Sequence, residues 1–509
     1  MRALFVIVLL AGNVTAADPQ ALADRIDAKL NQKLKAAKAT PAPAASDAEF
    51  HRRAHLDLCG RIPSAKEVHD FLADPSSDKR AKLIDHLLDT PRHAGHFAAV
   101  WRAALAPETA AVPEARLFQV GFEGWLRGHF RKNTRYDVLV RELIAVPISP
   151  DADNPTPALR DPAAPNPLAF VAVKDAKPEN LAAATTRVFL GRQTECAQCH
   201  DHPFDTWTQK QFWQTAAFFA GVQRSGDEMF GPLNEATDVR TLEPSELKSK
   251  AVSAQFLDGA KPLGKAGART ELAAWVTAKE NPYFAEATAN RVWGLLFGRG
   301  IVDPVDDFHA ANTPSHPELL DELAKAFVDA DFDLQYLVRA ICRTEAYRRT
   351  SARTDATQDD PKLFARMATK GLTGEQLYDS LLRATGQQDG DGRRSSRGEF
   401  LSRFAAGGKL ADPETSIPQA LALMNGKFMA ESTSAGKSPT LIAAAETPTL
   451  TTAERVEVLY VASLGRLPTE KERARIAKHV GDATGNELAE KLADVFWVLL
   501  NSAEFRLNH

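Results

Sequence analysis

Apolar residues recur at helical spacing along most of this chain. The spacing is clearest in Lys82 to Leu88, Tyr136 to Val146 and Asn180 to Leu190, where apolar side chains return every three or four positions. The part of the chain after about Lys265 is again rich in such stretches. The pattern therefore predicts a mainly α-helical protein with two helical domains and long irregular loops.

Three segments are expected to connect the folded parts, and two of them set the expected domain boundaries. Residues 17–46 are an Ala/Lys-rich amphipathic segment that ends in a Pro/Ala-rich run, and together they are expected to be a linker. Residues 147–166 contain prolines that can continue neither a helix nor a central strand, so they are expected to be a loop. Residues 225–262 are polar and are expected to link the two halves. We therefore expect folded domains over residues 47–224 and 263–509.

Helix starts can be located from capping boxes, in which a Ser or Thr is followed three residues later by Glu or Gln. Three boxes are predicted, at Ser315–Glu318, Thr208–Gln211 and Thr373–Gln376. A turn of the form Gly-Arg-apolar-Pro-Ser/Thr-x-x-Glu also occurs twice, at residues 60–67 and 465–472. We interpret the pair as a recurrent helix-start device, because a repeat architecture would need contiguous copies.

The first sixteen residues have the organisation of an export signal. Met1-Arg2 provides a positive start, residues 3–12 are an apolar run, and Val14-Thr15-Ala16 supplies small residues at a cleavage site. The apolar run is too short to span a bilayer, and a retained N-terminal anchor is the alternative. We expect a signal peptide over residues 1–16 and a periplasmic or extracellular mature protein without a transmembrane span.

Composition narrows the class further. The chain has 509 residues, of which 44% are hydrophobic, enough for a substantial core. Its formal net charge of -4, or -5 once Arg2 leaves with the signal peptide, gives no indication of nucleic acid as a partner. The sequence has no Gly-rich phosphate loop, nucleophile elbow or His-Glu-x-x-His run, so kinases, α/β-hydrolases and common metalloproteases are not supported. Cys59 and Cys342 are expected to be buried free thiols.

The most informative motif is Cys196-Ala197-Gln198-Cys199-His200. This C-x-x-C-H spacing is typical of c-type haem attachment. The two thiols can form thioethers with the haem vinyl groups, and an imidazole that follows directly can ligate the iron. The motif therefore predicts Cys196 and Cys199 as covalent anchors and His200 as an axial iron ligand.

Two haem-free alternatives use the same part of the chain. A zinc ion or another single metal ion could take thiolate, imidazole and carboxylate ligands from the motif and the loop after it, namely Cys196, Cys199, His200, His202, Asp201 and Asp205. The adjacency of Cys199 and His200 would strain such a site. The second alternative is a short disulfide or a dithiol formed by the two motif cysteines.

Other polar residues invite a functional interpretation. Candidates for the sixth iron position are His202, His309, His316, Met229 and Met424, although core packing is the simpler role for the two methionines. Asp303, Asp306 and Asp307 could join His309 and His316 in a second site, but acidic residues in a loop before a helix usually cap and solvate. Buried hydrogen bonds and packing that fix the second domain are expected at Asn290, Arg291 and Trp293.

The sequence around the motif resembles the planctomycete cytochrome c-like family, domain of unknown function 1549. The resemblance rests on Phe189-Leu190-Gly191, on residues 196–205 with Trp207, and on residues 56–64. Several later segments resemble the companion domain of unknown function 1553, namely residues 281–284, 290–293, 297–302, 304–308, 314–320 and 423–426. The resemblance implies a secreted protein in which residues 47–224 form the cytochrome c-like domain and residues 263–509 form the companion domain.

Together these observations predict a secreted c-type haem-binding protein with an electron-transfer or redox role and a redox or protein partner. The alternative is a haem-free secreted metal-binding or interaction module that uses the Cys/His cluster structurally.

Overall fold

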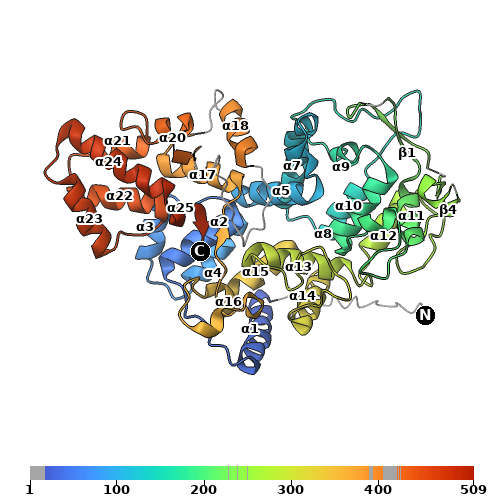
Figure 1. The fold of residues 1–509 in the computed structure, drawn as a ribbon, viewed down its shortest axis with the longest axis horizontal. Helices are drawn as coiled ribbons and strands as arrows, with labels where there is room; N and C mark the ends of the chain where they lie inside the picture. The colour runs from blue at the N-terminus through green and yellow to red at the C-terminus, as the bar shows by residue number, and fades with distance from the viewer. Residues whose placement is uncertain are drawn as a thin grey trace, which may run out of the picture.

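Helices account for most of the structure, and the mainly α fold predicted from the sequence is confirmed (Figure 1). The computed structural model describes residues 18–388 apart from 227, 238 and 249, then residues 394–404, 421, 423, 424 and 426–509. The predicted signal peptide, residues 1–16, lies outside the described residues.

The helices of the N-terminal half are α1 (Pro19–Ala36), α2 (Asp47–Cys59), α3 (Ala65–Ala73), α4 (Lys79–Leu88), α5 (Pro91–Leu105), α6 (Glu108–Ala111), α7 (Gln119–Arg131), α8 (Tyr136–Ile144), α9 (Ala169–Val173), α10 (Pro178–Leu190) and α11 (Gln209–Ala216). Those of the C-terminal half are α12 (Ala268–Val276), α13 (Phe284–Phe297), α14 (Pro317–Asp329), α15 (Leu334–Arg343), α16 (Glu345–Arg348), α17 (Gly374–Thr385), α18 (Arg394–Phe404), α20 (Lys427–Ser432), α21 (Pro439–Glu446), α22 (Thr452–Leu464), α23 (Glu470–Val480), α24 (Gly485–Asn501) and α25 (Ala503–Arg506).

Short 3₁₀ turns and strands connect these helices. The turns are η1 (Glu114–Phe118), η2 (Glu195–Gln198), η3 (Ala217–Phe219), η4 (Ser245–Leu247), η5 (Ala356–Gln358) and η6 (Pro361–Leu363). The strands form antiparallel pairs, β1 (Val222–Arg224) with β2 (Leu233–Glu235), β3 (Thr241–Leu242) with β4 (Val252–Ser253), and β5 (Lys370–Gly371) with β6 (Leu507–Asn508).

The segment expected to be a linker, residues 17–46, instead contains helix α1. Leu22, Ile26 and Leu30 recur every four residues, so they share one helix face, and all three are fully buried in the core beside α15. The Asp27 carboxylate accepts backbone hydrogen bonds from Glu345 (2.7 Å) and Ala346. The linker prediction is wrong here, because the Pro/Ala-rich run is confined to the end of the segment and follows an amphipathic helix.

The second expected linker, residues 225–262, is also folded in part. Strand β2 pairs with β1, and β4 pairs with β3. Leu233, Val252 and Leu257 from this segment are buried in the same core as the helices before it. Residues 225–262 are therefore a folded part of the larger core and not a linker. Their short strands give no helical periodicity in the sequence.

Two hydrophobic cores divide the molecule. The larger one collects apolar side chains from α1 to α16, with Met367 as its last member. The smaller one collects side chains from α17 to α25, together with Leu56 of α2 and Ile62 of the following turn. In Figure 1, α20 to α24 lie at one end of the molecule, α9 to α12 lie at the other, and α2 and α5 lie between them. The helices of residues 268–348 thus share a core with the N-terminal half.

A buried ionic network ties these parts together near α2. The Asp57 carboxylate accepts hydrogen bonds from Lys370 Nζ (2.5 Å), Asn508 Nδ2 (2.6 Å) and Tyr347 Oη (2.8 Å). The Lys370 ammonium also donates to the backbone oxygen of Leu296. A buried charge is tolerated only when it is paired and hydrogen-bonded, and this network meets that condition.

The local helix signals were mostly predicted correctly. Thr208 and Thr373 form the expected capping boxes with Gln211 and Gln376. The Ser315 prediction is wrong, because α14 begins at Pro317 and the Ser315 hydroxyl donates to the backbone oxygen of Ile301 instead (3.1 Å).

The two copies of the Gly-Arg turn adopt the same local structure and touch each other. In each copy a glycine in the left-handed region ends one helix, and a capping box starts the next, at Ser64–Glu67 and Thr469–Glu472. Pro63 of the first copy lies beside Gly465 of the second, and the preceding helices are joined by a hydrogen bond from Arg52 of α2 to the backbone oxygen of Ser463 in α22 (3.0 Å). The structure thus pairs the two copies although they are far apart in sequence.

Candidate functional site

The Cys-His motif lies on the connection between α10 and α11. Helix α10 ends at Gly191, whose φ of +67° and close approach to the Phe308 ring leave no room for a Cβ. The motif then forms the 3₁₀ turn η2, in which Ala197 is fully buried. Helix α11 holds the far side of the turn, because Trp213 Nε1 donates to the oxygen of Gln198 (3.1 Å). Both neighbouring helices therefore fix the position of the motif.

The two motif cysteines are exposed and are free thiols in this structure. The His200 side chain is also exposed, and its Nδ1 lies 2.7 Å from the backbone oxygen of Asp201. A histidine whose Nδ1 donates to a carbonyl presents Nε2 as its basic nitrogen, which is the usual arrangement for a metal-ligating imidazole. The Cys199 oxygen accepts from Gln209 Nε2 (2.9 Å), so α11 also anchors the second cysteine through its backbone.

The remaining predicted ligands of this loop are engaged in local backbone contacts. Asp201 Oδ1 accepts a hydrogen bond from the backbone N–H of Gln209 (2.7 Å), and Asp205 Oδ1 accepts one from the backbone N–H of Thr206 (2.8 Å). His202 Nδ1 accepts from the Phe204 amide (3.3 Å). Across the described ranges, no group of three or more His, Cys, Asp and Glu side chains is arranged to hold a metal ion.

The second candidate constellation does not converge on a site. Asp306 accepts hydrogen bonds from Arg187 (2.9 Å) and Gln193 (3.2 Å), so it joins its own loop to α10 and the segment before the motif. Asp303 lies 3.7 Å from Arg299, and Asp307 lies 3.6 Å from His309. These contacts give the acidic residues structural roles.

His316 is buried, and its Nδ1 lies 3.2 Å from Ser315 Oγ. Burial lowers the pKa of His316 to about 4. The imidazole is therefore neutral at neutral pH.

Asn290, Arg291 and Trp293 were expected to fix the second domain through buried hydrogen bonds and packing. Asn290 bonds to the backbone of Val302 through both its amide nitrogen (2.8 Å) and its oxygen (3.0 Å), which confirms its predicted role in fixing the second half. Arg291 makes a 3.8 Å ion pair with Asp306, and Trp293 is fully buried.

Of the methionines proposed for the sixth iron position, Met229 packs against the larger core. Met424 is 46% exposed, so the core-packing role is wrong for it. Cys59 and Cys342 are buried free thiols, as predicted.

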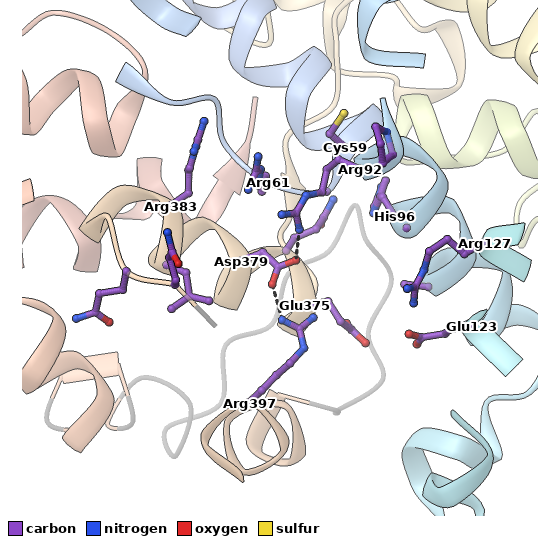
Figure 2. Close-up of a pocket in the computed structure, with 18 of the residues that line it drawn as sticks. Cys59, Arg61, Arg92, His96, Glu123, Arg127, Glu375, Asp379, Arg383 and Arg397 are labelled. Carbon is purple, nitrogen blue, oxygen red and sulfur yellow. Dashed lines mark hydrogen bonds and ion pairs between the residues drawn. The ribbon is translucent and has the colours of Figure 1, made fainter. Parts of the chain in front are cut away.

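A cavity of about 860 Å³ that the sequence did not indicate lies away from the motif (Figure 2). It is lined by the α2–α3 turn and by α5, α7, α17 and α18, and five of its lining residues are arginines: Arg61, Arg92, Arg127, Arg383 and Arg397. We call it the arginine pocket. None of the residues 196–205 lines it.

Comparison with known proteins identifies two family regions. Residues 25–224 match a family described as protein of unknown function DUF1549, and residues 268–402 match one described as protein of unknown function DUF1553. No curated protein and no solved structure matches the chain. Among the helices of the described residues, none is both long enough and apolar enough to cross a membrane. The chain therefore contains a region that matches DUF1549, followed by a region that matches DUF1553.

Proposed function

We propose that this protein is an exported c-type haem protein with an electron-transfer or redox role. The observation that supports it best is the state of the motif: two exposed free thiols three positions apart, followed directly by an exposed imidazole. Thioether formation requires that both thiols be unpaired and accessible. The export signal predicted for residues 1–16 is consistent with attachment outside the cytoplasm.

The residues present fit the chemistry of the group. Cys196 and Cys199 would hold the porphyrin covalently, and His200 would ligate the iron through Nε2 because Nδ1 contacts the Asp201 carbonyl. When bound, a haem supplies one-electron redox chemistry at its iron. Phe204, whose side chain is 74% exposed in the same loop, offers apolar surface to an apolar ligand.

The protein's own part in this proposal is to hold the motif in place. Gln209 and Trp213 of α11 bind the carbonyl oxygens of the turn, and buried Ala197 anchors it to the core. A fixed loop orients the imidazole relative to the two thiols. A closed zinc site would instead need about four ligands brought together.

The test is covalent haem retention. We expect the full chain, expressed with its export signal and haem-attachment machinery, to keep haem after denaturation, seen as added mass and as a haemochrome spectrum. Replacing both Cys196 and Cys199 by Ser should abolish the added mass, and His200→Ala should alter the spectrum of the folded protein. Cys59→Ser, which changes a cysteine outside the motif, is the matched control and should retain haem.

Two results would refute the proposal. One is a wild-type chain of unmodified mass under conditions in which a reference c-type cytochrome is loaded. The other is unchanged haem retention in the double Cys→Ser variant. Stoichiometric zinc that is lost in the same variant would favour the metal-binding alternative.

A further inference from the structure

The arginine pocket lies where the two family regions meet. Its lining from the DUF1549 region comes from the end of α2, the following turn, α5 and α7, and its lining from the DUF1553 region comes from α17 and α18. A volume of about 860 Å³ is within the range of small-molecule sites, which often form at domain boundaries. The geometry is independent of the Cys-His motif and of the function proposed for it.

The acidic side chains of the pocket are already neutralised. Glu123 and Glu375 both accept a hydrogen bond, each at 2.9 Å, from Arg102, a buried arginine behind the wall. Asp379 forms ion pairs with Arg92 (3.6 Å) and Arg397. These contacts leave the pocket with an excess of positive charge.

Two lining arginines have no ion pair with any described residue. Arg61 lies in the turn after α2, and Arg127 lies on α7, so they approach the cavity from different walls. In Figure 2, Arg61, Arg92 and Arg383 lie on one side of the pocket, whereas Arg127 lies on the other beside Glu123. Guanidinium groups left without carboxylates around a cavity are the usual binders of oxyanions.

The second copy of the Gly-Arg turn shows what this arginine does without a pocket. Arg466 occupies the position of Arg61 and forms ion pairs with Glu472 (2.9 Å) and Glu504 (2.6 Å). In the first copy the corresponding Glu67 binds Arg383 instead (2.9 Å). Burial and the nearby Arg92 and Arg383 lower the pKa of Arg61, whereas hydrogen bonds to Glu504 and Glu472 raise the pKa of Arg466. The two turns have the same local structure, but Arg466 is paired with carboxylates, whereas Arg61 lies near two other arginines.

The wall of the pocket also contains a buried histidine. His96 lines the pocket, and its Nε2 is buried without a hydrogen-bond partner in the described parts of the chain. Burial lowers the pKa of His96 to about 3, so the ring is neutral at neutral pH. Because its ring is neutral and its Nε2 is not exposed to the cavity, His96 adds no charge to the site.

We propose that the arginine pocket binds a small organic polyanion with at least two carboxylate, phosphate or sulfate groups. One anionic group meets Arg61 together with Arg92 and Arg383, and a second meets Arg127 on the opposite wall. The cavity selects a small molecule, and the separation of the cations selects more than one anionic group.

The test is calorimetric titration of the full chain with three probes: citrate, pyrophosphate and benzene-1,3,5-trisulfonate. At least one should bind at a single site, with an affinity that falls as salt is raised, and the neutral trimethyl citrate should not bind. Which probe binds best identifies the anionic group. Arg61→Gln and Arg127→Gln should each weaken binding tenfold or more. Arg131→Gln, which removes an exposed charge from the same helix as Arg127 outside the pocket, should leave the affinity unchanged.

Folding of each variant is checked by circular dichroism and melting temperature. If Arg61→Gln fails to fold, Arg127→Gln decides the outcome. The proposal is overturned if wild-type protein binds none of the three anions, or if Arg131→Gln loses as much affinity as the pocket variants. Haem retention is measured separately, so failure of one proposal leaves the other standing.

Discussion

At the level of single residues, helices α2 and α5 each contain two buried histidines. Burial lowers the pKa of His51 and His93 to about 4, and lowers the pKa of His55 and His96 to about 3. Each imidazole is therefore neutral in the folded state at neutral pH. Protonation would place a charge in a poorly solvated position, so the folded and unfolded chains differ in proton affinity.

We expect the free energy of unfolding to fall as the pH is lowered from 7 to 5. The unfolded chain protonates these histidines near pH 6.5, whereas the folded chain resists protonation until about pH 4, so acid favours the unfolded state. A single site such as His93 contributes about 2 kcal/mol to this loss. Urea unfolding at both pH values measures it.

The matched variants for this prediction are His93→Gln and His69→Gln. His93→Gln should reduce the pH dependence by the contribution of one site, whatever its effect on stability at pH 7. His69, whose side chain is 81% exposed, should leave the pH dependence unchanged when replaced. An identical pH dependence in wild type and His93→Gln would contradict the burial argument.

At the level of elements, a helix could be predicted correctly when its signal lay within a few neighbouring residues. The capping boxes at Thr208 and Thr373 were predictable because a cap involves residues three positions apart. The position of Ser315 was misread because the same pattern can precede a helix that begins one residue later, with Pro317 in its first turn. Helix α1 was missed because its apolar face is meaningful only beside α15, which lies some three hundred residues later.

The burial of α1 can be tested with one substitution. Leu30 is fully buried, so Leu30→Ala should lower the free energy of unfolding by about 2–5 kcal/mol through lost burial and a residual cavity. If residues 17–46 were a linker, the same substitution would have almost no effect. Lys35→Ala, an exposed position near the end of the same helix, is the control and should change stability by about 0.5 kcal/mol or less. Denaturant titration distinguishes the two cases.

At the scale of the whole molecule, the sequence does not show which side chains from distant segments pair with one another. The C-x-x-C-H motif is contiguous, so its residues could be named without a structure. The arginine pocket could not, because Arg61, Arg127 and Arg383 come from three distant segments and their importance depends on which carboxylates bind other arginines. The repeated turn places Arg61 and Arg466 in the same local sequence context, but the sequence does not show that the two arginines have different partners.

The C-terminal helices beyond the second family region are integral to the fold. Arg52 of α2 is completely buried and donates to the backbone oxygens of Ser463 (3.0 Å) and Phe505 (2.8 Å). Asn508 donates a hydrogen bond to the Asp57 carboxylate and belongs to β6, which pairs with β5. A chain ending at residue 402 would lose these partners, leaving a buried guanidinium unsatisfied and the smaller core open.

We therefore expect the chain 18–402 to lack a stable smaller core, although it retains both family regions completely. It should bind a hydrophobic dye, lose near-ultraviolet circular dichroism and be cleaved rapidly by protease within residues 374–402, a range that contains α17 and most of α18. The chain 18–509, which keeps every described contact, is the matched control and should show none of these effects. A monomeric 18–402 chain with control-like protease resistance over residues 374–402 would show that this part folds without α20 to α25. In that case the buried contacts of Arg52 and Asp57 would be dispensable, and the division into two cores would not describe how the chain folds.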